Sequence, residues 1–235
     1  ISKGDLGFFR MSEDADLVVP GEPSKSGGTN ARRFEPLRDA LRDLRGELGA
    51  PAGVPVVLTV GRLAHEKSQD LLLRCAARLR AAGVEHRLVV VGHGELEGEL
   101  RRLAGELGVA DLVVLAGKTE EPQSFYRSAD VFALSSRIEG MPNVLMEAQL
   151  FGLPAVTTRS GGSAEVVADG ETGLVVEVGD EPGFAAALRR LLEDPELRRR
   201  MGDAAARRMV SELGLDRTVA AMDALAAEGL PGRTA

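Results

Sequence analysis

The feature that most constrains this chain is a regular alternation of short apolar segments with longer amphipathic ones, beginning at residue 55. The short segments are rich in Val and Leu and end at Gly, Pro or polar residues, as buried parallel strands do. Between them, apolar residues such as Leu72, Cys75 and Leu79 keep the spacing of one helix face. The expected strands cover residues 55–60, 87–91, 112–116, 131–134, 155–158 and 174–177.

Six such strands with crossover helices predict an α/β fold, a doubly wound, parallel, six-stranded Rossmann-like sheet. After residue 180 the apolar pattern is purely helical, with helix starts expected near Asp180 and Asp194. In such a sheet, ligands bind in the crevice beyond the carboxyl ends of the strands. The loops that follow the strands are therefore where functional residues are expected.

Composition excludes several classes of function. The 235 residues are 44% hydrophobic, which is ordinary for a globular protein, and the net charge of −7 leaves no basic stripe for nucleic acid. Aromatic content of 3% without Trp argues against sugar recognition by stacking. The lone Cys75 excludes an intramolecular disulfide, and no apolar run is long enough to cross a membrane. We expect a cytoplasmic protein that binds no nucleic acid.

The loop and helix after the fourth expected strand, residues 135–147, carry the strongest chemical signal. Pro142 marks a first helical position, so Glu139 falls in the loop and Glu147 about one turn into the helix. A helix start offers N–H groups and a positive dipole end to a phosphate, and ionised carboxylates accept hydrogen bonds from sugar hydroxyls. A nucleotide sugar has both kinds of group.

Two further loops support an anionic ligand. In Gly61-Arg62-Leu63-Ala64-His65-Glu66-Lys67, Arg62 and Lys67 follow the first strand and can converge on a diphosphate. Gly92 and Gly94 follow the second strand and let the backbone approach a ligand closely. The histidines of these loops lack a second ligand at metal-site spacing, so we interpret them as polar loop residues, and Cys75 as core packing.

Taken together, these motifs resemble the large family of retaining glycosyltransferases with the GT-B architecture and an E-x7-E motif, of the group 1 or family 4 type. The resemblance covers about residues 15–225. It implies that Glu139 holds hydroxyls of the transferred sugar, that Glu147 holds the ribose, and that Arg62 and Lys67 neutralise the leaving diphosphate. Arg62, Lys67 and Glu139 are then the catalytic set, and neither a metal nor a cofactor is implied.

The same resemblance implies a wider set of donor-binding residues. Those expected are Gly61, Gly92, Gly94, Gly117, Lys118, Gly140, Met141, Pro142, Asn143, Val144, Leu145 and Glu147. Relatives often have Gly where this chain has Ser68. The glycines of residues 160–165 are interpreted as backbone necessities, with Glu165 as a cap or a supporting residue. The donor is a nucleotide diphosphate sugar, with a UDP-sugar favoured and a GDP-sugar as the alternative.

The resemblance also implies a domain organisation. Residues 1–14, with a weak amphipathic pattern, would be a remnant of the last helix of a preceding acceptor domain or of the hinge, and residues 15–235 the donor-binding domain. Residues 15–20 are expected to form a strand, 21–30 a loop longer than the family's turn, and 37–48 a helix closed by Gly49. The chain begins at Ile1 without a signal peptide, so we expect a fragment that lacks its N-terminal acceptor domain.

The implied function is transfer of a sugar to the hydroxyl of a glycan, lipid or small-molecule acceptor in glycan or cell-envelope biosynthesis. The full-length protein could then lie peripherally on the inner membrane face. The fragment alone is expected to bind nucleotide without transferring sugar, and Glu139→Gln to leave bare diphosphate binding unchanged. Two alternatives stay open: a nucleotide-sugar epimerase of the same architecture, which needs no acceptor, and a non-catalytic nucleotide-sugar binding module. For the two glutamates themselves, the alternative is chance spacing among 36 acidic residues.

Overall fold

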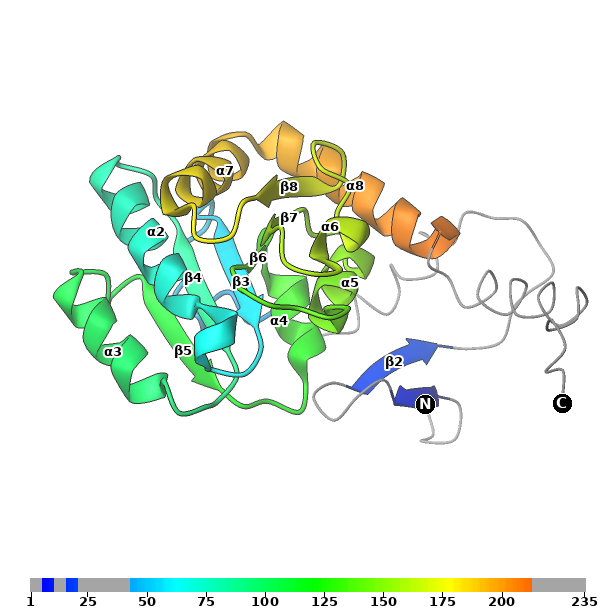
Figure 1. Cartoon of the computed structure of the whole chain (residues 1–235), viewed down its shortest axis with the longest axis horizontal. Helices are drawn as coiled ribbons and strands as arrows, with labels where there is room; N and C mark the ends of the chain where they lie inside the picture. The colour runs from blue at the N-terminus through cyan, green and yellow to red at the C-terminus, as the bar shows by residue number, and fades with distance from the viewer. Residues whose placement is uncertain (1–5, 11–15, 21–42, 213–235) are drawn as a thin grey trace, which may run out of the picture.

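The computed structural model describes residues 6–10, 16–20 and 43–212, and its main body is a six-stranded, all-parallel sheet (Figure 1). The strand order is β5-β4-β3-β6-β7-β8. The strands are β3 (Val56–Val60), β4 (Arg87–Val91), β5 (Val113–Gly117), β6 (Val131–Leu134), β7 (Ala155–Thr158) and β8 (Gly173–Val176). Each lies within one residue of its expected bounds. The Rossmann-like fold class predicted from the sequence is confirmed.

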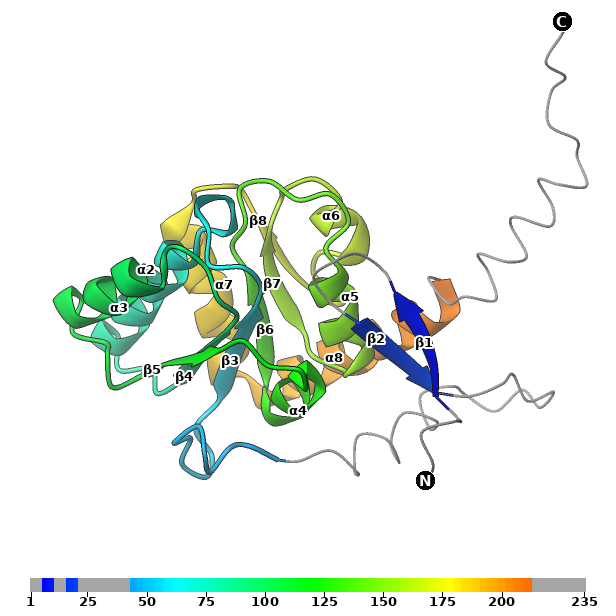
Figure 2. The same ribbon diagram turned by 90° about the horizontal axis from the view of Figure 1, so that it is seen from below.

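Helices cover both faces of this sheet (Figure 2). The helical elements are η1 (His65–Lys67), α2 (Gln69–Ala81), α3 (Glu97–Glu106), α4 (Pro122–Ser128), α5 (Asn143–Leu150), α6 (Ser163–Val166), α7 (Glu181–Glu193) and α8 (Pro195–Glu212). α2, α3 and α7 pack on one face, and α4, α5 and α6 on the other. The expected helix starts are confirmed, because Asp180 caps α7 through the Gly183 N–H and Asp194 accepts from the Leu197 N–H, both at 2.9 Å.

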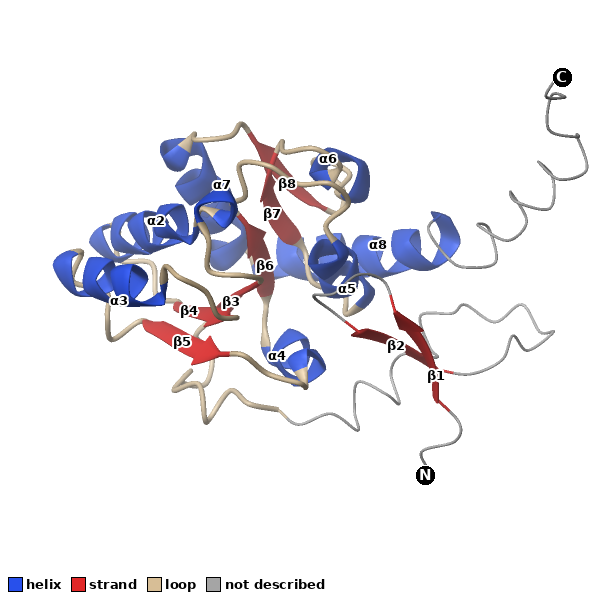
Figure 3. Ribbon diagram, turned by 60° about the horizontal axis from the view of Figure 1, so that its bottom comes forward, coloured by secondary structure: helices blue, strands red, loops and turns tan. Residues whose placement is uncertain are grey.

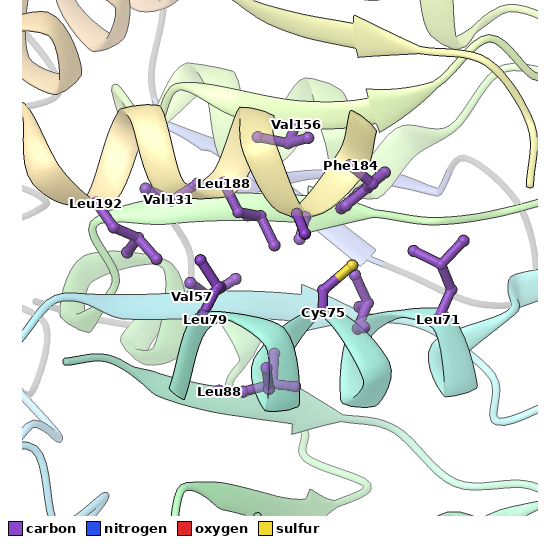
Figure 4. Packing of buried hydrophobic residues seen from close by; sticks show 14 of the residues in the cluster. Val57, Leu71, Cys75, Leu79, Leu88, Val131, Val156, Phe184, Leu188 and Leu192 are labelled. Carbon is purple, nitrogen blue, oxygen red and sulfur yellow. The ribbon is translucent and has the colours of Figure 1, made fainter. Parts of the chain in front are cut away.

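The strands alternate their side chains between two apolar clusters, as the period of two requires. On the face of α2 and α7, Val57 of β3 and Val156 of β7 pack with Cys75 and Phe184 (Figure 4). On the other face, Leu58 and its neighbours pack under α4 and α5. Both faces are therefore buried, which explains why the strand sequences are continuously apolar.

The side on which successive strands join the sheet changes at β3, while all six strands stay parallel. β4 and β5 add successively to one side of β3, after which the chain crosses back and β6 pairs with its other side (Figure 3). The loops after β3 and β6 consequently leave neighbouring strands and run in opposite directions. This is the topological switch point of a doubly wound sheet, where a crevice opens at the carboxyl ends of the strands.

The N-terminal part differs from expectation at one point. β1 (Leu6–Arg10) is a strand that pairs antiparallel with β2 (Asp16–Pro20), so the expected strand is present, but a helix over the first residues is wrong. The loop expected at 21–30 lies outside the described residues, as do positions 37–42 of the expected helix. Its described end, residues 45–49, is a turn in which Gly49 has a φ of +60°. None of the described helices is long and apolar enough to span a membrane.

Candidate functional site

A nearly buried ion pair joins the two loops at the switch point. The ammonium of Lys67, from the loop after β3, lies 2.9 and 3.1 Å from the two carboxylate oxygens of Glu139, from the loop after β6. The Glu139 side chain is only 7% exposed and that of Lys67 25%. The Ser136 hydroxyl donates to the same carboxylate at 2.5 Å. The structure thus brings together two of the three residues predicted to be catalytic.

Backbone contacts fix the spacing of these two loops. The Arg137 N–H donates to the Glu66 carbonyl at 2.7 Å, and the Ser135 hydroxyl donates to the carbonyls of Lys67 and Ser68 at 3.0 and 2.8 Å. Ser68 has a φ of +50°, in the left-handed region that favours glycine. This conformation lets the chain turn sharply from η1 into α2.

The loop after β7 supports Glu139 from its other side. Gly162 donates its N–H to the Gly140 carbonyl at 2.8 Å. A Cβ on Gly161, whose φ is +51°, would lie 1.7 Å from the Glu139 carbonyl oxygen. These glycines are required so that one backbone can pack directly on the other, as predicted. Glu165, in contrast, is exposed on α6 and caps no helix there, so the structure does not support its predicted capping role.

Gly92 and Gly94 perform the same function on the opposite side of β3. A Cβ at Gly92 would lie 1.9 Å from the Gly61 carbonyl oxygen, and one at Gly94 would lie 2.3 Å from the Leu63 carbonyl oxygen. The backbone that these glycines approach in the structure is that of the neighbouring loop. The Gly92 N–H also donates to the Gly117 carbonyl at 2.8 Å. Contact of Gly92, Gly94 and Gly117 with a donor stays a prediction.

Arg62 lies in the loop after β3, and its side chain is 57% exposed. It forms an ion pair with Glu66, four residues further on. The pKa of Glu66 is lowered, first by a backbone hydrogen bond and further by the charges of Arg62 and Lys67. Both cations predicted to hold a diphosphate are therefore paired with carboxylates, and one pair is exposed while the other is nearly buried.

Helix α5 begins at Asn143, one residue after the expected start at Pro142, and Glu147 lies in its second turn. The Glu147 side chain is buried, and its Oε2 accepts a hydrogen bond from the Tyr126 hydroxyl at 2.8 Å. Burial raises the pKa of Glu147, while the Tyr126 hydrogen bond partly opposes that shift. Burial also raises the pKa of Tyr126. A hydroxyl that donates to Glu147 would favour its charged form, which is the chemistry expected for a ribose.

The remaining predicted donor residues are distributed around this helix start and along the strand ends. Pro142 is the residue before α5 rather than its first position, and the Leu145 N–H already donates to the Pro142 carbonyl at 3.0 Å. The Leu145 side chain is fully buried. Met141 and Lys118 are exposed. Asn143 and Val144 lie in the first turn, half-buried.

The residues dismissed as metal ligands lie as predicted. His65 and His93 are exposed in separate loops, while Cys75 is buried between α2 and α7, and burial raises its pKa to about 12. Within residues 6–10, 16–20 and 43–212, no three His, Cys, Asp or Glu side chains gather in a cluster that could hold a metal ion.

Sequence reasoning missed three residues of the site. Glu66 could have been found, because its spacing of four from Arg62 is typical of an ion pair on one turn. Tyr126 had a weaker signal, as the only tyrosine of the chain. Ser136 adjoins the motif, but nothing in the sequence distinguishes it from Ser135.

A doubly wound parallel sheet with cations, carboxylates and a helix start at its switch point defines an α/β domain of the Rossmann-like type. Residues 42–208 match the family model described as glycosyl transferases group 1. The chain therefore belongs to this glycosyltransferase family, and the resemblance drawn from its motifs is confirmed.

Individual relatives agree with this assignment. The chain is 39% identical over 159 residues to the lipopolysaccharide core biosynthesis glycosyltransferase LpsE of Rhizobium meliloti, covering 68% of this chain and 46% of that protein. It is 38% identical over 184 residues to a GDP-mannose-dependent alpha-(1-6)-phosphatidylinositol monomannoside mannosyltransferase of Mycolicibacterium smegmatis, covering 74% and 48%. The crystal structure of Anabaena HepE in complex with UDP-glucose shares the fold, with a TM-score of 0.69, 24% identity, and coverage of 77% and 52%. The chain spans about half the length of these proteins.

Proposed function

We propose that this chain is the donor-binding half of a retaining glycosyltransferase, which transfers a sugar from a nucleotide diphosphate sugar to an acceptor hydroxyl. The observation that carries the proposal is the Lys67–Glu139 pair at the switch point, 2.9 Å apart and nearly buried. A cation for the diphosphate and a carboxylate for sugar hydroxyls are thereby held within one hydrogen bond of each other. They match two adjacent parts of one nucleotide sugar.

The chemistry expected of the site is electrostatic. As the bond between sugar and diphosphate breaks, negative charge grows on the departing phosphate oxygens. Lys67, Arg62 and the start of α5 would stabilise that charge, and a preorganised arrangement is effective because little reorganisation is needed. Glu139 would orient the sugar, and Glu147 would accept hydrogen bonds from the ribose. These carboxylates are assigned to different parts of the donor, so we do not propose a glycosidase-like acid and nucleophile pair.

The identity of the donor is part of the proposal. Members of the family or fold named above use GDP-mannose in one case and bind UDP-glucose in another. We favour a UDP-sugar, with a GDP-sugar as the alternative. Because the chain spans about half the length of its relatives, the acceptor and a second domain that binds it belong to the proposal as well.

Calorimetric titration with UDP and GDP tests the donor site directly. We expect Lys67→Ala and Arg62→Ala each to weaken diphosphate binding, since a charge-assisted contact contributes about 1.5–3 kcal/mol. The effect of Arg62→Ala should be the smaller, because its side chain is more exposed. Arg101→Ala is the matched control, as Arg101 is an exposed arginine of α3 that pairs only with Glu97 among the described residues.

Two outcomes would contradict the proposal. If Lys67→Ala bound UDP and GDP as tightly as the parent chain, the donor site would be wrongly placed. If the chain converted a nucleotide sugar into its epimer without any acceptor, the site would be correct but the reaction would be an isomerisation. We expect neither, and no transfer of sugar by these residues alone.

A further inference from the structure

A hollow of about 340 Å³ lies next to the ion pair, on the side of α2 and α7. It is lined by Ser68, which precedes α2, by Arg74 of α2, by Ser135 and Arg137 from the loop after β6, and by Val178 from the loop after β8. Its volume is within the range of about 300–1,000 Å³ that is typical of small-molecule pockets. None of the residues predicted to hold the donor lines it.

Two arginines supply positive charge to this hollow, and neither is held tightly. The nearest contact of Arg74 with Asp70 is 3.8 Å, which is too long for a hydrogen bond. The Arg137 Nε donates to the Ser68 hydroxyl at 3.4 Å, and Arg137 forms no ion pair with any residue that the structure describes. Both guanidinium groups therefore retain N–H donors for a ligand.

The two acidic residues of the lining each have a donor of their own. Glu181 accepts a hydrogen bond from Arg78 at 2.5 Å, and Asp70 accepts one from the Ser68 hydroxyl at 3.1 Å. Glu181 therefore does not require the two arginines of the hollow as partners, and Asp70 makes only the long 3.8 Å contact with Arg74. An arginine fork matches the geometry of a carboxylate or phosphate, so an oxyanion is the ligand that this arrangement suits.

The position of the hollow indicates where its ligand would lie relative to the donor. Ser135 and Arg137 line the hollow, while Ser136 between them donates to Glu139. Similarly, Ser68 lines the hollow and the preceding Lys67 pairs with Glu139. The same two loops thus present one set of side chains to the proposed sugar position and another to the hollow, so a group bound there lies beside the donor.

We infer that this hollow binds the phosphate or carboxylate group of a second ligand, held by Arg74 and Arg137 next to the donor. The inference rests on the proposed function in one respect: if sugar is transferred at this site, the second ligand is an anionic acceptor. The oxyanion site itself depends only on the side chains described.

The test is a titration of the ¹⁵N-labelled chain with inorganic phosphate and, separately, with acetate, followed by NMR in the presence and absence of UDP. We expect the amides of Ser68, Arg74 and Val178 to shift, with or without UDP. The stronger of the two probes identifies the oxyanion. Arg137→Gln and Arg74→Gln should each weaken the response at least about tenfold, as loss of a charge-assisted contact would, whereas the exposed control Arg101→Gln should leave it unchanged.

The outcomes separate the two proposals. Phosphate or acetate shifts that are confined to the residues around Lys67 and Asn143, and abolished by UDP, would overturn the second site. The same holds if both arginine variants bind the probes as the parent chain does. If the hollow responds as expected while Lys67→Ala leaves UDP binding intact, the oxyanion site stands and the proposed donor site fails.

Discussion

Replacing Glu139 with Gln should strengthen binding of a bare nucleoside diphosphate. Both oxygens of the Glu139 carboxylate accept hydrogen bonds from the Lys67 ammonium, at 2.9 and 3.1 Å. A diphosphate has to compete with this carboxylate for Lys67, and this competition opposes binding. The neutral amide removes the charge. The result differs from the expectation based on the motif alone, in which Glu139 affects only the sugar.

The magnitude follows from the kind of contact that is lost. A hydrogen bond between charged groups contributes about 1.5–3 kcal/mol and a neutral one about 1 kcal/mol. The free-energy cost of taking Lys67 from residue 139 should therefore be about 0.5–2 kcal/mol lower in Glu139→Gln. UDP should therefore bind about 2- to 30-fold more tightly to Glu139→Gln than to the parent chain. The additional affinity contributed by the sugar of a UDP-sugar should decrease, because the amide is the weaker acceptor for hydroxyls.

Isothermal titration with UDP and with UDP-sugars measures both effects. Glu66→Gln is the matched control, since it removes the same charge from the exposed pair with Arg62, and exposed pairs contribute only about 0–1 kcal/mol. In a Lys67→Ala background, Glu139→Gln should have no effect on UDP. Equal gains in Glu139→Gln and Glu66→Gln, or a gain that persists without Lys67, would refute competition through the ion pair.

Three further predictions concern the support of the site and its dependence on pH. Gly161→Ala should lower the free energy of unfolding in urea by about 1–3 kcal/mol more than Gly170→Ala, because both glycines have positive φ but only Gly161 has a backbone atom in the way. Burial raises the pKa of Glu147, so calorimetry should show UDP affinity falling as the pH drops through that pKa, with little pH dependence in Glu147→Gln. Burial lowers the pKa of His86, so the unfolded chain binds more protons below about pH 6.5 and stability is lost there. Urea titrations at several pH values should show that the free energy of unfolding of His86→Leu depends less on pH than that of the parent chain. An equal pH dependence would contradict the role of His86. Equal losses of unfolding free energy in the two glycine variants, or a UDP affinity of Glu147→Gln that still depends on pH, would contradict the other two predictions.

The strands were predictable because a buried parallel strand needs apolar residues on both sides. Val56 and Val57 point to opposite faces of the sheet, and both faces are covered by helices. Polar turns at both ends of this pattern made it possible to locate the six strands to within a residue. The order in which they pair leaves no such mark in the local sequence.

For that reason the residues of the site were predictable but not their mutual contacts. Lys67 and Glu139 each stand in a recognisable motif, yet the ion pair between them exists only because β6 returns to the free side of β3. The hydrogen bond between Tyr126 and Glu147 depends similarly on how α4 lies against α5. Long-range contacts of this kind follow from topology, and a single sequence does not specify them.

The central place of β3 also has a consequence for how the protein is made. Its two partners enter the sheet at different times: β4 begins at Arg87, but β6 only at Val131. As the chain is synthesised, β3, β4 and β5 can assemble while the far edge of β3 is still unpaired, and an unpaired apolar edge promotes aggregation. Chains released before Val131 would expose this edge and could contain no Lys67–Glu139 pair.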